Sequence, residues 1–169
     1  MLGVYNKFPK DLQWTGSFFV SVSAKRLQQI LFDSIERLNI ETLDLEEIAD
    51  PSIPNCKVNF EIGVADGDEI CLLDDETKLK LLAVLKKRSF ERLDFLFVVR
   101  YRKMSSGLGV RMRFDYYLLR LLFNEKVVQF DLAHKKGVRH TAPSDVANLI
   151  VDRINAAYTR KILKIVEDN

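Results

Sequence analysis

Cysteine is scarce in this 169-residue chain, which carries only Cys56 and Cys71. Two isolated cysteines do not make a CxxC redox motif, a zinc knuckle or the framework of a disulfide-rich domain. Such residues are usually small buried hydrophobic side chains. A single disulfide between them is the alternative, and the cytoplasmic location expected for the chain argues against it. We therefore expect two buried free thiols.

Long apolar runs are also missing. Charged residues such as Arg100, Asp115 and Arg120 interrupt them before they reach the roughly 18 to 20 residues that a membrane-spanning helix needs. The first ten residues contain Lys7 and Lys10, which break any apolar core of a secretory signal. These absences predict a soluble, cytoplasmic protein that does not bind membranes.

Local signatures of common enzymes are absent as well. The chain has no GxSxG, HExxH, GxxxxGK[ST] or GxGxxG motif. Gly107-Leu108-Gly109 lies between two predicted strands with no helix after it, so we interpret it as a hairpin connection and not as a phosphate loop. The acidic cluster at 66–69 lacks the further ligands of a calcium loop, and the acidic residues at 74–76 are interpreted as the start of a helix, where they match the helix dipole. We therefore expect no cofactor and no metal, and no catalytic residue can be assigned.

The size and composition fit one folded unit. Hydrophobic residues make up 47% of the chain, enough to build one substantial core at this length. No Gly/Ser-rich linker, internal repeat or low-complexity tract divides the sequence. We expect a single domain over residues 1–169.

Charge is distributed unevenly along the chain. Residues 1–90 carry 11 basic against 15 acidic residues, whereas residues 91–169 carry 15 against 9. Between Glu41 and Glu76, twelve acidic residues are accompanied by Lys57 alone. Such polarity is typical of a surface that faces a charged partner, although a solvated acidic face is the commoner cause.

Hydrophobic periodicity predicts an α+β protein with a mostly antiparallel sheet of about five strands and helices packed on one face. Alternating apolar residues predict the strands, and Ser23 is a suitable N-cap for the first helix. The acidic, proline-containing segment 41–55 is expected to be a surface loop. The order β-α-β-α-β-β-β-α comprises strands at 14–22, 57–64, 93–104, 109–123 and 126–134, and helices at 24–39, 75–88 and from 143 onward.

Two of these elements have unusual features. Apolar residues change parity along the strand 109–123, which predicts a bulge or burial on both faces near Leu118 to Arg120. The final helix begins at Pro143, and its apolar stripe continues through Ile162 and Ile165. It would be a long C-terminal helix of about 25 residues, longer than a small sheet can cover. Its end is therefore expected to project or to pack on a second copy.

Basic residues gather around the hairpin predicted between strands 93–104 and 109–123. The hairpin brings them to one end of the sheet, but the register that decides whether they share a face cannot be read from the sequence. On one face, with Tyr101 or Tyr117 nearby, they would suit phosphates and bases. The alternative is that they pair with the acidic residues of 41–76 or keep an edge strand soluble. The candidate anion-binding residues are Arg100, Arg102, Lys103, Arg111 and Arg113, extended by Lys135, Lys136, Arg139 and His140.

Both histidines, His134 and His140, flank the basic turn at 135–139. No acidic residue or cysteine lies between them, so a metal would need ligands from elsewhere in the chain. An enzyme with an unfamiliar site would use Tyr116, Tyr117 or His134 in a pocket under the sheet, and only a cleft with convergent polar groups would support that hypothesis.

Three functions are consistent with these features. The first is a non-catalytic binding or adaptor module that acts through protein association, including self-association, because of the charge polarity and the long final helix. The second is binding of RNA or DNA through the basic hairpin. The third is an enzyme with an unrecognised pocket.

Overall fold

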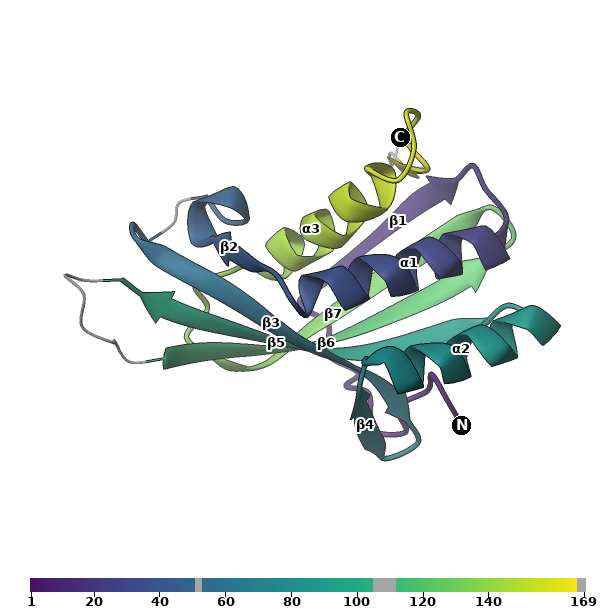
Figure 1. The fold of residues 1–169 in the computed structure, drawn as a ribbon, viewed down its shortest axis with the longest axis horizontal. Helices are drawn as coiled ribbons and strands as arrows, with labels where there is room; N and C mark the ends of the chain where they lie inside the picture. Colours follow the sequence, from purple (N-terminus) through teal and green to yellow (C-terminus); the bar gives the residue numbers. More distant parts are fainter. Residues whose placement is uncertain (51–52, 105–111, 167–169) are drawn as a thin grey trace.

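An antiparallel sheet and three helices make up the α+β structure seen in the computed structural model (Figure 1). The structure describes residues 1–50, 53–104 and 112–166. The sheet order is β2-β3-β5-β6-β7-β1-β8, and β4 pairs with β3 beside this path. In chain order the elements are β1 (Trp14–Val20), α1 (Ala24–Leu38), β2 (Thr42–Asp44), the 3-10 helix η1 (Leu45–Glu47), β3 (Cys56–Asp66), β4 (Glu69–Leu72), α2 (Asp75–Lys87), β5 (Arg92–Lys103), β6 (Met112–Asn124), β7 (Val127–Gly137), α3 (Pro143–Asn155) and β8 (Leu163–Ile165).

Side-chain caps fix the starts of the first two helices. The hydroxyl of Ser23 accepts the N–H of Arg26 at 3.2 Å, and the carboxylate of Asp74 accepts the N–H of Thr77 at 2.9 Å. This bond lowers the pKa of Asp74, because the backbone N–H of Thr77 favours the charged carboxylate. Helices α1 and α2 therefore begin at the residues that the sequence predicts.

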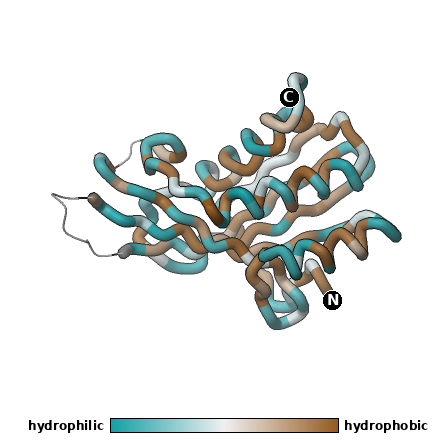
Figure 2. Tube along the Cα trace, in the orientation of Figure 1, coloured by the Kyte–Doolittle hydropathy of each residue, from teal (hydrophilic) through white to brown (hydrophobic). Residues whose placement is uncertain are grey.

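One face of the sheet, here called the helix face, is covered by α1 and α3, which pack together, with α2 beside α1. Lys78 of α2 ties the helices by ion pairs to Asp33 and Glu36 of α1. Figure 2 shows hydrophobic residues along the strands and alternating with hydrophilic residues along the helices. The strand side chains that form the core on this face include Phe18, Val58, Phe60, Phe95, Phe97, Tyr117, Leu119, Phe130 and Leu132.

The opposite side, here called the second face, is partly covered by the chain before β1. Asp94 is fully buried there and accepts the N–H of Tyr5 at 2.7 Å. The guanidinium of Arg120 donates to both carboxylate oxygens of Asp94, at 2.8 and 2.9 Å, and lies over the ring of Phe8 at 4.2 Å. A buried charge requires such pairing, so these contacts fix the N-terminal segment against the sheet.

The middle strand, β6, is buried on both faces where the sequence predicts an irregularity. Leu118 and Leu119 are 3% and 0% exposed, although they point to opposite faces. A register shift between β6 and β7 falls just before them, because Tyr116 pairs with Lys136 and Tyr117 pairs with His134. Lys135 is therefore an extra residue in β7, and the bulge lies opposite Tyr116 and Tyr117, not at Leu118 to Arg120.

The predicted sheet of about five strands is too small, since the described residues form eight. Each missed strand, β2, β4 or β8, has only three or four residues, which is too few to display an alternating pattern. The segment 41–55 is thus not only a loop, because it contains β2 and η1. Of the two cysteines, both free, Cys56 is buried and Cys71 is partly exposed. Burial raises the pKa of the Cys56 thiol.

The prediction of a long C-terminal helix is wrong. Helix α3 has 13 residues and ends at Asn155, and the chain then turns back as β8 against β1. The side chain of Asn155 accepts the N–H groups of Ile162 and Leu163 and donates to the carbonyl of Leu163. Burial of Ile162 and Leu163 in the core stabilises this turn. None of the helices in the described ranges has the length and apolar character needed to cross a bilayer.

Replacing Asn155 by Ala should destabilise the protein by about 1–3 kcal/mol, because two backbone N–H groups lose their acceptor. Chemical denaturation of both proteins measures the difference. Asn148→Ala is the matched control, since Asn148 lies exposed on the same helix, and it should change stability by less than about 0.5 kcal/mol. Equal effects of the two substitutions would contradict this role for Asn155.

Candidate functional site

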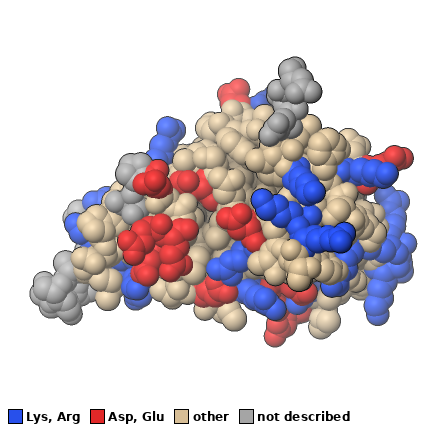
Figure 3. Space-filling view, turned by 90° about the horizontal axis from the view of Figure 1, so that it is seen from above, with Lys and Arg blue, Asp and Glu red and all other residues tan. Residues whose placement is uncertain are grey.

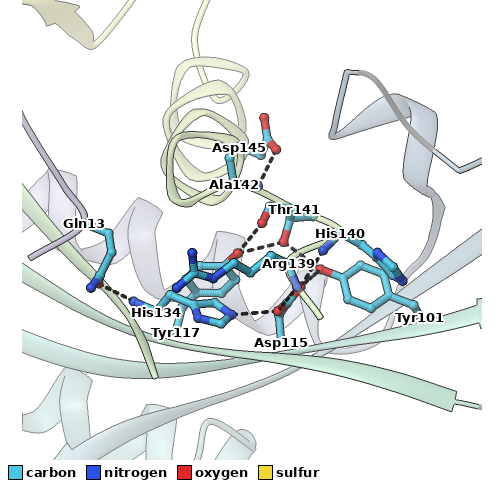
Figure 4. A network of polar contacts seen from close by, with 10 residues as sticks. All are labelled: Gln13, Tyr101, Asp115, Tyr117, His134, Arg139, His140, Thr141, Ala142 and Asp145. Carbon is cyan, nitrogen blue, oxygen red and sulfur yellow. Dashed lines mark hydrogen bonds and ion pairs between the residues drawn. The ribbon is translucent and has the colours of Figure 1, made fainter. Parts of the chain in front are cut away.

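The carboxylate of Asp115, at the start of β6, is fully buried and accepts four hydrogen bonds (Figure 4). Its Oδ1 accepts from Nε2 of His134 and from the N–H of Arg139, both at 2.7 Å. Its Oδ2 accepts from the hydroxyl of Tyr101 at 2.5 Å and from the N–H of His140 at 3.0 Å. Four donors compensate the loss of hydration that a buried carboxylate suffers.

The turn between β7 and α3 has the backbone shape that these bonds require. Arg139 has a φ of 57° and Gly137 a φ of 131°. A Cβ at Gly137 would overlap the carbonyl of Phe114 and the carboxylate of Asp115, so only glycine fits there. The turn consequently presents its backbone N–H groups to Asp115.

Two buried tyrosines extend the network to Thr141. The hydroxyl of Tyr117 donates to the carbonyl of Thr141, and the Thr141 hydroxyl lies 2.7 Å from the hydroxyl of Tyr101. Burial raises the pKa of Tyr117 to about 12. Burial and the hydrogen bond to Asp115 raise the pKa of Tyr101 further. Both phenols therefore remain protonated donors at neutral pH.

His134 is the member of the network that borders open space. Its side chain is 6% exposed, its ring meets that of Tyr117 edge-to-face at 5.0 Å, and its backbone N–H donates to Gln13. Within the described ranges, only Nε2 of the ring has a hydrogen-bond partner. His140 is held differently, since its ring packs against Tyr101 and its N–H is bonded to Asp115.

A pocket of about 490 Å³ opens beside this network. It lies between the end of β7, the turn that follows and the start of α3. The volume falls within the range of small-molecule sites. Its lining residues are Gln13, Asp50, Tyr117, His134, Arg139, His140, Thr141, Ala142, Pro143 and Asp145.

The register of β5 and β6 separates the cations of the predicted hairpin. Residues directly opposite in an antiparallel pair point to the same face, and Arg113 lies opposite the buried Tyr101. Arg113 is thus on the helix face, whereas Arg100 and Arg102 are on the second face. Arg111 lies outside the described residues. The condition for the basic hairpin, one shared face, is not met by its described members, and Tyr101 and Tyr117 are buried where no base can reach them.

Other aromatic residues do accompany Arg100 on the second face. The guanidinium of Arg100 lies over the ring of Phe114 at 5.5 Å, and that ring is 6.3 Å from the ring of Tyr116. The ammonium of Lys136 lies over Tyr116 at 4.8 Å. Both rings are partly exposed. We call these four residues, which cross β5, β6 and β7, the cation–aromatic stripe.

Most of the predicted anion-binding cations have no carboxylate partner in the part of the chain that the structure describes. Arg100 is the exception, because it pairs with Glu61. Figure 1 shows the ends of β3, β5 and β6 extending beyond the helices, so this end of the sheet is accessible. The cations without an ion pair among the described residues are Arg102, Lys103, Arg113, Lys135, Lys136 and Arg139.

Asp115, Gln13, Thr141 and Asp145 are the site residues that the sequence analysis missed. Asp115 is an acidic residue in a strand of apolar and basic residues, and this contrast is the available signal. Gln13, Thr141 and Asp145 have no such signal, because they reach the site only through the fold. Of the enzyme candidates, Tyr117 and His134 line the pocket, and Tyr116 points to the other face.

Tyr117→Phe should cost about 1 kcal/mol at neutral pH, because the Thr141 carbonyl loses its donor. The folded protein keeps Tyr117 protonated to a higher pH than the unfolded chain does. Ionisation of Tyr117 therefore leaves stability unchanged below about pH 10 and lowers it by about 2 kcal/mol as the pH rises to 12, because the unfolded chain loses this proton first.

Chemical denaturation at pH values from about 8 to about 12 measures this effect. The quantity compared is the difference in the free energy of unfolding between wild type and Tyr117→Phe, in which the contributions of other titrating groups cancel. Tyr116→Phe is the control, because its hydroxyl has no hydrogen bond among the described residues, and its replacement should change stability at neutral pH by less than about 0.5 kcal/mol. A pH-independent difference for Tyr117→Phe would show that Tyr117 ionises equally in both states.

Comparison of the chain with protein-family models, curated proteins and solved structures found no significant match. Function is therefore inferred from the residues of this chain and their geometry.

Proposed function

We propose that the protein is a non-catalytic binding module that holds single-stranded nucleic acid on the second face of its sheet. The observation that carries this proposal is the cation–aromatic stripe of Arg100, Phe114, Tyr116 and Lys136. Its two rings on β6 lie between a guanidinium on β5 and an ammonium on β7, so bases and phosphates would find partners at neighbouring positions.

Partly exposed rings on a sheet are suitable stacking surfaces. Each base presents a flat aromatic face, and stacking on a protein aromatic ring contributes about 1–3 kcal/mol per base. Phe114 and Tyr116 lie on one face of β6, two residues apart, so two successive bases could stack on them. Double-stranded nucleic acid keeps its base faces covered, and the stripe therefore favours a single strand.

The surrounding charges suit a phosphate backbone. Arg102 shares the second face with the stripe and has no carboxylate partner in the described residues, and Lys136 has none either. The pair of Arg100 with Glu61 is solvent-accessible, with side chains 39% and 48% exposed, so it contributes little and a phosphate can replace the carboxylate. Lys103, Lys135 and Arg113 add positive potential around the same end of the sheet.

This surface differs from the basic hairpin that the sequence suggests. Arg113 lies on the helix face and would act on a strand bound to the second face only at long range. The aromatic partners are Phe114 and Tyr116 in place of Tyr101 and Tyr117. The cations that contact the strand would be Arg100, Arg102 and Lys136.

Binding can be measured by fluorescence anisotropy with labelled oligouridylate and oligothymidylate at low salt. Phe114→Leu with Tyr116→Leu keeps the apolar surface but removes both rings, and we expect at least about tenfold weaker binding. Lys136→Gln should weaken binding and reduce the salt dependence by about one phosphate contact.

Phe19→Leu is the matched control, because Phe19 is an exposed aromatic residue on β1, outside the stripe, and its replacement should leave the affinity unchanged. Absence of binding at low salt, or binding that tolerates loss of both rings, would contradict the proposal.

Protein association is a second candidate, and the arrangement of charge in space favours it. Figure 3 shows acidic side chains gathered at the end that carries β2 and η1, and basic side chains at the end where α1 begins and α2 ends. Glu46 and Glu47 of η1 have no ion pair among the described residues. At the other end, Lys25 lies beside Lys86, whose carbonyl it contacts at 3.3 Å. Helix α3 is short, so a projecting C-terminal helix does not support this association.

Complementary ends predict self-association that weakens with salt. Sedimentation velocity at low and high salt tests this expectation. Reversing the acidic end with Glu46→Lys and Glu47→Lys should abolish association, as should Lys86→Glu with Lys87→Glu. A mixture of the two variants should associate again, because the native basic end of one variant can pair with the native acidic end of the other. A monomer at low salt would contradict this candidate.

A further inference from the structure

The imidazole of His134 is oriented so that one nitrogen remains available. The carboxylate oxygens of Asp115 accept hydrogen bonds from three other donors, and Nε2 of His134 completes the set as the donor at 2.7 Å. In the neutral ring, Nδ1 is then the acceptor. It has no partner within the described ranges, although the side chain is only 6% exposed, and the residue lines the pocket of about 490 Å³.

A cation lines the same pocket. The backbone of Arg139 is fixed by its bond to Asp115, and its guanidinium has no carboxylate partner in the described part of the chain. Arg139 lines the pocket together with Tyr117 and His134. Figure 4 shows the Arg139 side chain reaching back along this wall of the pocket. A planar guanidinium matches a phosphate or carboxylate.

Two carboxylates also line the pocket. Asp145 accepts the N–H of Ala142 with one oxygen at 2.7 Å, and Asp50 is exposed. A pocket that combines one guanidinium with two carboxylates does not suit a bare anion, because the carboxylates would repel it. It suits a molecule that combines an anionic group with hydroxyl groups.

We propose that this pocket is a binding site for a small hydroxylated oxyanion, of the class of phosphorylated sugars and alcohols. Arg139 pairs with the oxyanion. Nδ1 of His134 accepts a hydrogen bond from one hydroxyl group of the ligand, and the carboxylate of Asp145 accepts a hydrogen bond from a second. The buried Asp115 is a positioning residue, because it holds the His134 tautomer and the Arg139 backbone without touching the ligand.

A network that only fixed the turn before α3 would need the backbone N–H groups of Arg139 and His140, the Tyr101 hydroxyl and Nε2. It would need neither the guanidinium of Arg139 nor an Nδ1 of His134 that is available to a ligand. The two roles therefore differ in their response to substitutions that keep the bonds to Asp115.

The test uses the full chain labelled with ¹⁵N at histidine, titrated with glycerol 3-phosphate and, separately, with glycerol and inorganic phosphate. We expect saturable binding of glycerol 3-phosphate, a shift of the His134 Nδ1 resonance, and an Nε2 resonance that still reports a bond to Asp115. Glycerol and inorganic phosphate should each bind at least about tenfold more weakly, because each lacks one half of the recognised group.

Two variants separate ligand binding from folding. Arg139→Gln and His134→Gln should each weaken binding about tenfold or more while leaving the folded spectrum intact, since the glutamine amide at 134 can still donate to Asp115. Lys135→Gln, next to the site but outside the pocket, should bind as wild type does. No Nδ1 shift with glycerol 3-phosphate, or affinity unchanged by both substitutions, would overturn the proposal. Equal affinity for inorganic phosphate would overturn the role of His134 as hydroxyl acceptor.

Discussion

The buried carboxylate of Asp115 is the interaction on which both candidate surfaces depend. It draws donors from β5, from β7 and from the turn before α3, so three separate parts of the chain meet at one charge. Removing any donor would leave a buried charge incompletely compensated, which is costly. The end of the sheet is therefore held rigidly even though it extends beyond the helices. Rigid placement matters for recognition, because it reduces the entropy lost on binding.

The bulge at Lys135 divides this end of the sheet between two roles. His134 and Lys136 are two residues apart, and in a regular strand they would point to the same face. The extra residue places His134 opposite Tyr117, on the helix face, and Lys136 opposite Tyr116, on the second face. One irregularity thus supplies an imidazole to the pocket and an ammonium to the cation–aromatic stripe. Bulges re-aim side chains in this way near functional sites.

Much of the fold could be predicted from the sequence, because local signals act over one element. The N-cap Ser23, the acidic residues at 74–76 and the alternation at 57–64 correctly place α1, α2 and the main part of β3. β8 could not be predicted, since Ile162 and Ile165 also fit a helical stripe and the Asn155 bonds that end α3 arise only in the folded chain. The same limit applies to the site. The sequence identified His134 and the cations, but their faces depend on a register that many long-range contacts set.

The second face raises the question of why its cations are not all neutralised internally. Arg120, near the N-terminal segment, is bound to the buried Asp94, and burial makes that pairing necessary. Towards the exposed end the requirement disappears, because water can solvate Arg102 and Lys136. Arg100 is intermediate. It pairs with Glu61, yet its Nε is buried without a hydrogen-bond partner among the described residues. The gradient from paired to unpaired cations therefore runs from the part of the face that stabilises the fold to the part that is available to a ligand.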